Sequence, residues 1–178
     1  MTTAEPIISD PVSDIITVFV AAMREAFTPD SEFPPIGGGS TDVRVFAGDG
    51  IPIETWNAHA DNGCDNPFLW VRLVRRYRTE NFPSPSTSPS NCSLPRAAAI
   101  EVGVGRCAVV GLEPSWEDYA NEAEVSIDDS WRIELALCRA LAKAREQHLA
   151  HAGASDLIAP YGPDGGIVAY LGMGYVQF

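Results

Sequence analysis

The sequence predicts an α+β domain in which a largely antiparallel sheet of about four strands carries two main helices packed on one face. Apolar residues recur at three- and four-residue spacing in 11–27 and again in 126–151, which indicates two amphipathic helices. Two segments rich in β-forming residues, 68–79 and 96–110, flank a proline- and serine-rich stretch, which indicates a long hairpin. No second block of distinct composition occurs in the 178 residues, so we expect a single domain, 1–178.

The first predicted helix, 11–27, is expected to begin after Ser9 or Asp10, because either side chain can cap a helix. Pro11 suits its first turn. The residues before it, 1–10, are expected to form an extended N-terminal arm, since two prolines oppose helix there.

Between this helix and the hairpin, the sequence predicts a short strand, 42–47, and then a polar loop, 51–67. The loop holds residues that metal sites and Cys–His catalytic pairs also use: Trp56, His59, Asp61, Cys64 and Asp65. A zinc site needs four ligands at short regular spacing, and a nucleophile needs a positioned base. Neither pattern is present, so we expect no metal, no cofactor and no catalytic residue here.

The predicted hairpin has one apolar face and one solvated face. Even positions of its first strand hold arginines, namely Arg72, Arg76 and Arg78. In the second strand Glu101 lies on the side opposite Ile100, Val102 and Val104. Antiparallel pairing would place an arginine beside Glu101 on the solvated face. The connecting arch, 83–95, is longer than a usual hairpin loop, and we expect it to belong to a partner surface.

An acidic segment, 111–125, follows the hairpin and is expected to form a solvated loop or a short helix. The second main helix, 126–151, is expected to begin at a capping box of Ser126 and Asp129 and to end before Gly153. Its expected apolar stripe comprises Trp131, Leu135, Cys138, Ala142 and Leu149, with Ile133, Leu137 and Leu141 beside it.

A turn-rich linker, 160–166, leads into a last predicted strand, 167–178. Gly172 and Gly174 would weaken a central strand and permit the close approach of another backbone. We therefore expect an edge strand, or a strand that pairs with a neighbouring subunit.

The charge balance limits the possible partners. A net charge of −12 argues against a nucleic-acid grip, because neutralising phosphates requires an excess of lysine and arginine. The N-terminus lacks the features of a secretory signal, and no segment is apolar enough for a membrane span, so we expect a soluble protein made in a cytoplasm. The four cysteines are expected to be free buried thiols, with a Cys64–Cys92 bond across the hairpin base as the alternative.

Several phrases resemble the tail terminator proteins of siphophages, particularly those infecting actinobacteria. The phrases are Pro67–Leu73, Arg75–Arg78, Arg96–Val104 and the glycine-rich last strand. The resemblance implies a virion structural protein that forms a homohexameric ring in the tail or neck after assembly in the host cytoplasm. Such a ring caps the tail tube, ends its polymerisation and joins it to the head-side connector protein.

The resemblance also implies that DNA passes through the lumen of the ring without specific binding, and an acidic lumen would repel phosphate. The family's functional residues lie on interfaces, so it implies no catalytic position. The long arch and the acidic 111–125 segment depart from its smaller members. The candidate interface residues are Phe19, Met23, Arg72, Arg76, Arg78, Pro85, Pro89, Trp116, Tyr119, Tyr170 and Tyr175.

Three other functions are compatible with the sequence. Another head-to-tail connector, a stopper or an adaptor, belongs to the same class. A small α/β enzyme of acyltransferase type would use Glu101, Cys107 or His59, although the absence of a catalytic motif favours a non-enzyme. A monomeric protein that binds a host component is the third.

Overall fold

A computed structural model describes residues 10–61, 64, 66–88, 91–111 and 113–178. The elements are α1 (Pro11–Phe27), β1 (Val43–Ala47), α2 (Ile53–Ala60), β2 (Phe68–Arg78), the 3₁₀ turn η1 (Asn91–Ser93), β3 (Arg96–Cys107), α3 (Trp116–Glu146), β4 (Ala152–Asp164) and β5 (Ile167–Gln177). In these residues five strands form one sheet in the order β1-β2-β3-β5-β4. β1 is parallel to β2, and every other neighbouring pair is antiparallel. The α+β class is confirmed, with five strands instead of about four.

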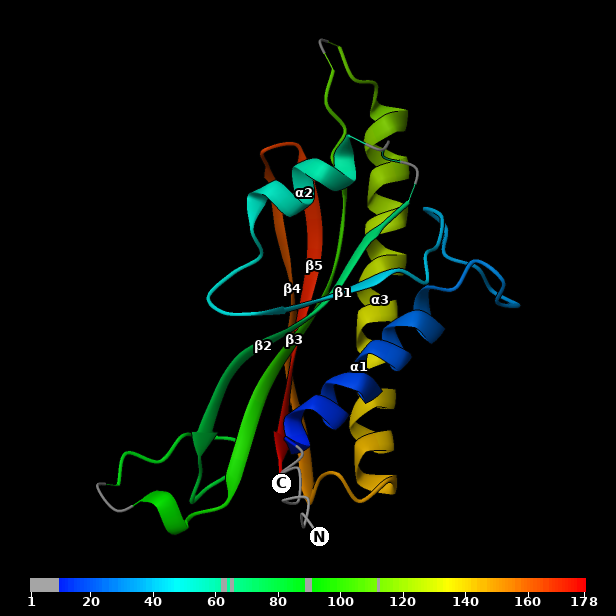
Figure 1. The fold of residues 1–178 in the computed structure, drawn as a ribbon. Helices are drawn as coiled ribbons and strands as arrows, with labels where there is room; N and C mark the ends of the chain where they lie inside the picture. The colour runs from blue at the N-terminus through cyan, green and yellow to red at the C-terminus, as the bar shows by residue number, and fades with distance from the viewer. Residues whose placement is uncertain (1–9, 62–63, 65, 89–90, 112) are drawn as a thin grey trace, which may run out of the picture.

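The two long helices, α1 and α3, cover the same face of the sheet (Figure 1). Their buried side chains meet those of the sheet in the main core, whose largest fully buried members include Phe19, Phe27, Leu69, Ile100 and Leu137. The much shorter α2 packs on the opposite face, where Trp56 joins a second, aromatic cluster with Phe68 and Trp70. The sheet therefore has one fully covered face and one partly open face.

Helix α1 has the bounds that the sequence predicts. The Asp10 side chain accepts a hydrogen bond from the Val12 backbone N–H at 3.2 Å, and Pro11 occupies the first turn. Residues 1–9, which hold most of the expected N-terminal arm, lie outside the described residues.

Helix α3 begins ten residues earlier than the sequence analysis predicts. Its capping box is formed by Ser115 and Asp118, and the Ser126–Asp129 pair lies inside the helix, so the expected start at Ser126 is wrong. The acidic segment from Trp116 onward is thus helical. The helix ends at Glu146, five residues before the expected end at 151, and Gly153 lies in β4 and does not end it, so this prediction is wrong as well. His148 takes a left-handed conformation with φ of 58° between the helix and β4.

The buried face of α3 also differs from the predicted stripe. It comprises Asp129, Arg132, Ile133, Ala136, Leu137, Ala140 and Ala144. Trp131 and Cys138 are exposed. Alanines make up most of this face from Ala136 onward, and their small side chains let the helix lie close to the sheet. The sequence analysis instead predicted the buried face from the larger side chains.

The C-terminal strand, β5, is an interior strand, so the expected edge position is wrong. It pairs with β3 on one side and with β4 on the other, and the predicted 160–166 linker is largely the end of β4. Its glycines make room for side chains of the helices. A Cβ at Gly172 would lie 2.6 Å from Leu137 Cδ1, and one at Gly174 would lie 2.9 Å from Phe19 Cε1. Small residues there allow the helices to pack directly on the sheet.

A β-bulge at Val74 divides β2 into two halves. Before the bulge, Arg72 pairs with Glu101 on the face that α1 and α3 leave free. After it, the alternation is shifted by one residue, and Arg76 reaches Asp10 at the start of α1. The predicted antiparallel pairing is confirmed, but the single solvated arginine face is wrong, because the bulge sends the arginines to different sides.

Helix α2 lies where the sequence analysis predicts a polar loop. Pro52 precedes it, and among the α2 side chains whose burial the structure describes, Trp56 is the buried one, 7% exposed. A helix of eight residues is too short for its periodicity to be recognised from the sequence. No helix in the described part of the chain has both the length and the apolar character needed to cross a bilayer.

Candidate functional site

A cavity of about 330 Å³ opens on the sheet face opposite α1 and α3. It lies between α2 and the β4–β5 hairpin, and its lining is mostly apolar and aromatic. The residues that shape it include Trp56, Phe68, Trp70, Tyr161 and Leu171. A buried pair of opposite charge, Arg72 and Glu101, also contributes to the lining.

The Arg72–Glu101 pair is held by a complete set of hydrogen bonds. Arg72 Nε donates to Glu101 Oε1 at 2.9 Å and Nη2 donates to Oε2 at 2.5 Å. Arg72 Nη1 donates to the Gly48 carbonyl at 2.7 Å, and the indole N–H of Trp70 donates to Glu101 Oε1 at 3.0 Å. The two residues are only 9% and 8% exposed, so the expectation that this pair is solvated is wrong. Hydrogen bonding to Glu101 raises the pKa of Arg72 further above its usual value, so Arg72 stays charged.

The position of Trp70 depends on a glycine in the neighbouring strand. Trp70 lies opposite Gly103, and a Cβ there would lie 2.1 Å from the indole ring at Cζ2. Only a residue without a side chain permits this ring to lie across β3, where its N–H reaches Glu101.

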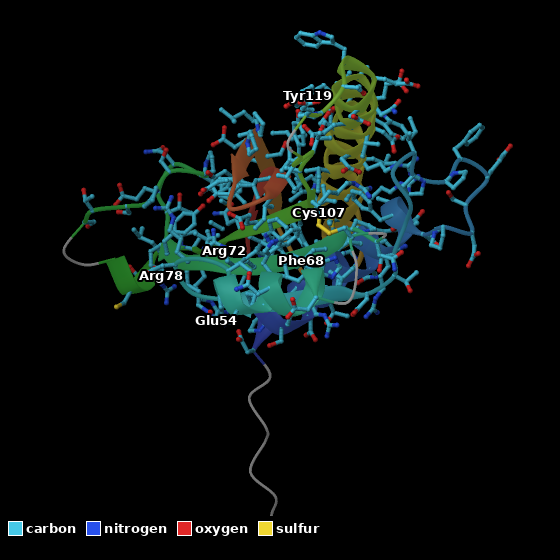
Figure 2. The ribbon with its side chains drawn as sticks, turned by 90° about the horizontal axis from the view of Figure 1, so that it is seen from above. Glu54, Phe68, Arg72, Arg78, Cys107 and Tyr119 are labelled. Carbon is cyan, nitrogen blue, oxygen red and sulfur yellow. A yellow bond between two sulfur atoms is a disulfide. The ribbon has the colours of Figure 1, made fainter. Side chains whose placement is uncertain are left out.

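A disulfide joins Cys64 to Cys107, with a Cα–Cα distance of 5.7 Å. It ties the segment after α2 to the end of β3, close to the aromatic cluster (Figure 2). The expected free thiols at these positions are therefore wrong, and so is the alternative Cys64–Cys92 bond. Cys92 and Cys138 are free, but both are exposed instead of buried.

The structure also shows the surroundings of the three residues that the enzyme alternative would use. Cys107 is oxidised in this structure, Glu101 is held by Arg72 and Trp70, and the His59 ring lies 2.9 Å from the Asn66 carbonyl. Cys107 in this state offers no thiolate. Among the described residues, no group of three or more His, Cys, Asp or Glu side chains is placed to hold a metal ion.

The arch between β2 and β3 is held by hydrogen bonds from its own flanks. Ser86 N–H donates to the Arg78 carbonyl at 2.7 Å, and the Thr79 hydroxyl donates to the Ser84 carbonyl at 2.7 Å. Arg78 Nη1 crosses the arch to the Leu94 carbonyl at 2.7 Å, and Tyr77 Oη donates to the Pro83 carbonyl at 2.8 Å. These bonds fix both ends of the arch. Pro85 is exposed on it, whereas Pro89 lies outside the described residues.

The base of the hairpin is attached to α1 through an ion pair. Both terminal nitrogens of Arg76 contact the Asp10 carboxylate, which also caps α1. The hydrogen bond from Arg76 is the largest cause that lowers the pKa of Asp10 to about 2. Arg76 thus connects the hairpin to the first turn of the helix.

The N-terminal half of α3 presents large apolar side chains to solvent. Trp116 is 89% exposed and Tyr119 is 44% exposed, and their rings lie 6.3 Å apart. Ile127 and Trp131, at 69% and 53% exposure, continue the same side of the helix. We call these four residues the α3 stripe. The sequence analysis identifies only the first two as interface residues, because it assigns Trp131 to the buried face.

The other predicted interface residues lie elsewhere. Phe19 and Met23 are fully buried between α1, α3 and the sheet. Tyr170 is partly buried against the main core, and the Tyr175 hydroxyl donates to Asp156 at 3.3 Å. The structure thus brings Trp116 and Tyr119 together and places the hairpin arginines far from them (Figure 2).

A second buried pair, which the sequence analysis does not identify, joins the loop after α1 to β3 and α3. Arg106 contacts the Asp129 carboxylate through two nitrogens, at 2.5 and 2.7 Å, and also donates to the carbonyls of Gly37 and Gly38. A Cβ at Gly37 would lie 2.8 Å from the guanidinium carbon. The glycine-rich loop is therefore a close-packed support for Arg106.

The described structure defines the class of the protein as a small α+β domain with one helix-covered sheet face, a partly open face and a projecting arch. No family model matches the sequence, and a search of curated proteins finds no similar one.

Proposed function

We propose that the chain is a virion structural protein, a ring-forming tail terminator that caps the tail tube and joins it to the head-side connector. The observation that carries the proposal is the β2–β3 hairpin. Its far end projects away from the helices and carries an arch with hydrogen-bonded flanks (Figure 1). A projecting segment that is ordered by its own chain suits a contact with another subunit, because little entropy is lost when it binds.

Three further features support this proposal. The phrases around β2 and β3 resemble tail terminators, as described above. The exposed apolar side chains of the α3 stripe form a surface of the kind that marks protein contacts. The net charge of −12 suits a ring whose lumen lets DNA pass without holding it.

A stopper or adaptor in the same neck region would use the same features, so the test must separate the two. We would measure the mass of the purified chain in solution and image it by negative stain with the tube subunit of the same phage. Rings that cap short tubes are the expected result. Rings that leave tube growth unchanged would favour a stopper or adaptor, and monomers that leave it unchanged would overturn the proposal.

A further inference from the structure

The α3 stripe is an apolar surface with an acidic border. At about 100° per residue, Trp116, Tyr119, Ile127 and Trp131 fall within an arc of roughly 120° on the solvent side of α3. Residues 108–131 contain seven carboxylates and no lysine, arginine or histidine.

Several of these carboxylates have partners within the chain. Asp118 closes the capping box, Glu122 accepts the Val109 N–H, Asp128 pairs with Arg132, and Asp129 pairs with Arg106. Glu117 and Glu124 are exposed along one border of the stripe, and neither forms an ion pair with the described residues. The stripe therefore offers aromatic rings beside free negative charge.

The far half of the β2–β3 hairpin has the opposite character. Residues 75–96 hold four of the chain's 12 basic residues and a single carboxylate, Glu80. Arg75 and Arg96 are exposed, and their guanidinium groups lie over the rings of Tyr77 and Phe178, at 5.4 and 5.2 Å from the ring centroids. Neither has a carboxylate within 4.0 Å among the described residues. Arg75 lies opposite Ala99 and Arg96 lies opposite Arg78, so the two arginines point to opposite faces of the hairpin. Arg75 shares the face of Tyr77, whose hydroxyl donates to the Pro83 carbonyl.

The described part of the arch adds exposed prolines to this positive charge. Pro83 and Pro85 are both exposed, and the hydrogen bonds at the ends of the arch fix the backbone around them. Proline-rich segments bind surfaces lined with aromatic side chains, and arginine stacks on tryptophan. The arch end is therefore complementary to the α3 stripe: its positive charge is opposite to that of the acidic border, and its prolines suit the aromatic side chains of the stripe.

The two surfaces lie on opposite sides of the molecule, so one chain cannot join its own pair. Figure 1 shows the arch and the start of α3 at opposite ends, and Figure 2 places Arg78 and Tyr119 far apart in the second view. We propose that the arch end of one copy, with Pro83, Pro85 and Arg75, binds the α3 stripe of the next copy. This contact rests on the proposed ring, and it specifies the two surfaces that meet.

Contacts between two different surfaces have a defined consequence for assembly. Each copy uses its arch toward one neighbour and its stripe toward the other, which closes a ring when the rotation between copies permits. A symmetric dimer cannot satisfy this arrangement with a single contact, so assembly should proceed to a closed ring.

Charge reversal on each side gives the test. We expect Arg75→Glu, and separately Glu117→Arg/Glu124→Arg, to convert rings of the full chain into monomers of 19.1 kDa in light scattering after gel filtration. All three positions are exposed, so far-ultraviolet circular dichroism should be unchanged. As matched controls, Leu157→Ser and Glu54→Arg change an exposed leucine and an exposed glutamate elsewhere and should leave the rings intact.

Mixing the two reversed variants is the decisive measurement. Each variant alone places like charges at its arch–stripe contact, whereas in an equimolar mixture every contact between the two variants joins opposite charges, so the mixture should recover rings in which the variants alternate. A mixture that stays monomeric although each variant is folded would count against this contact. Rings that persist in both variants and still cap tubes would overturn this contact and leave the proposed function intact. A wild-type chain that stays monomeric at high concentration would overturn the contact. The tube-capping experiment described above would then test the proposed function separately.

Discussion

Replacing Arg72 by methionine should be strongly destabilising, because it leaves the Glu101 carboxylate buried with the Trp70 indole as its one remaining donor in the described structure. The side chains of Arg72 and Glu101 are each 10% exposed, so water can replace little of the lost contact. Breaking a buried ion pair by removing one partner costs about 3–5 kcal/mol. For a chain of this length, each kcal/mol lowers the melting temperature by about 2–4 °C, which predicts a decrease of roughly 6–20 °C.

The assay is thermal and urea unfolding followed by circular dichroism, with two further variants. Arg44→Met removes an exposed pair with Asp42, whose side chains are 58% and 63% exposed, and should cost less than about 1 kcal/mol. Arg72→Met/Glu101→Leu removes both buried charges and should be more stable than Arg72→Met alone, since no charge is left unpaired.

Two outcomes would refute this reasoning. If Arg72→Met costs no more than Arg44→Met, the Arg72–Glu101 pair is effectively solvated. If the double variant is less stable than Arg72→Met alone, the two side chains stabilise the protein independently and not as a pair.

Three other predictions follow from single contacts. Arg76 holds the pKa of Asp10 at about 2, so the ionised Asp10 carboxylate stabilises the fold above about pH 4, and this stabilisation is lost as the pH falls from 4 to 2. Asp10→Asn can still cap α1 but has no charge to lose. Its urea midpoint should therefore fall less over that pH range than the midpoint of the wild-type chain. Gly103→Ala should cost about 1–3 kcal/mol in urea unfolding, because its methyl group collides with the Trp70 ring, and an unchanged midpoint would contradict that packing. Cys107→Ser should lower the free energy of unfolding by about 2–4 kcal/mol without reductant, because it removes a disulfide that closes a loop with a sequence separation of 43. Adding reductant should destabilise the wild-type chain and leave the stability of the variant unchanged.

The parts of the fold that the sequence predicts are those with a strong local signal. The bounds of α1 follow from the Asp10 cap and an apolar stripe, and the β2–β3 hairpin follows from two long alternating segments. The start of α3 was ambiguous, because Ser115–Asp118 and Ser126–Asp129 have the same capping spacing. The helix begins at the Ser115–Asp118 capping box and continues without interruption through Ser126 and Asp129.

The features that the sequence analysis missed depend on tertiary packing. Strand β4 contains prolines and glycine that resemble a turn, and it is a strand because β5 supplies its hydrogen bonds. Arg72 resembles a solvated residue until its contacts with the Gly48 carbonyl and the Glu101 carboxylate are known. For the interface, Trp116 and Tyr119 are recognisable as exposed aromatics in an acidic segment, whereas Trp131 needs the helix phase that the alanine-rich buried face sets.

The bulge at Val74 has a consequence for how this protein can evolve. The half of β2 before it is constrained by the Trp70–Glu101–Arg72 network and by the glycine that the indole requires. The half beyond it carries the arch, and its own side chains are exposed or only partly buried. Residues added to or lost from the arch therefore leave the pairing of the first half unchanged. The length and charge of the arch can therefore change while the sheet beneath it keeps its register.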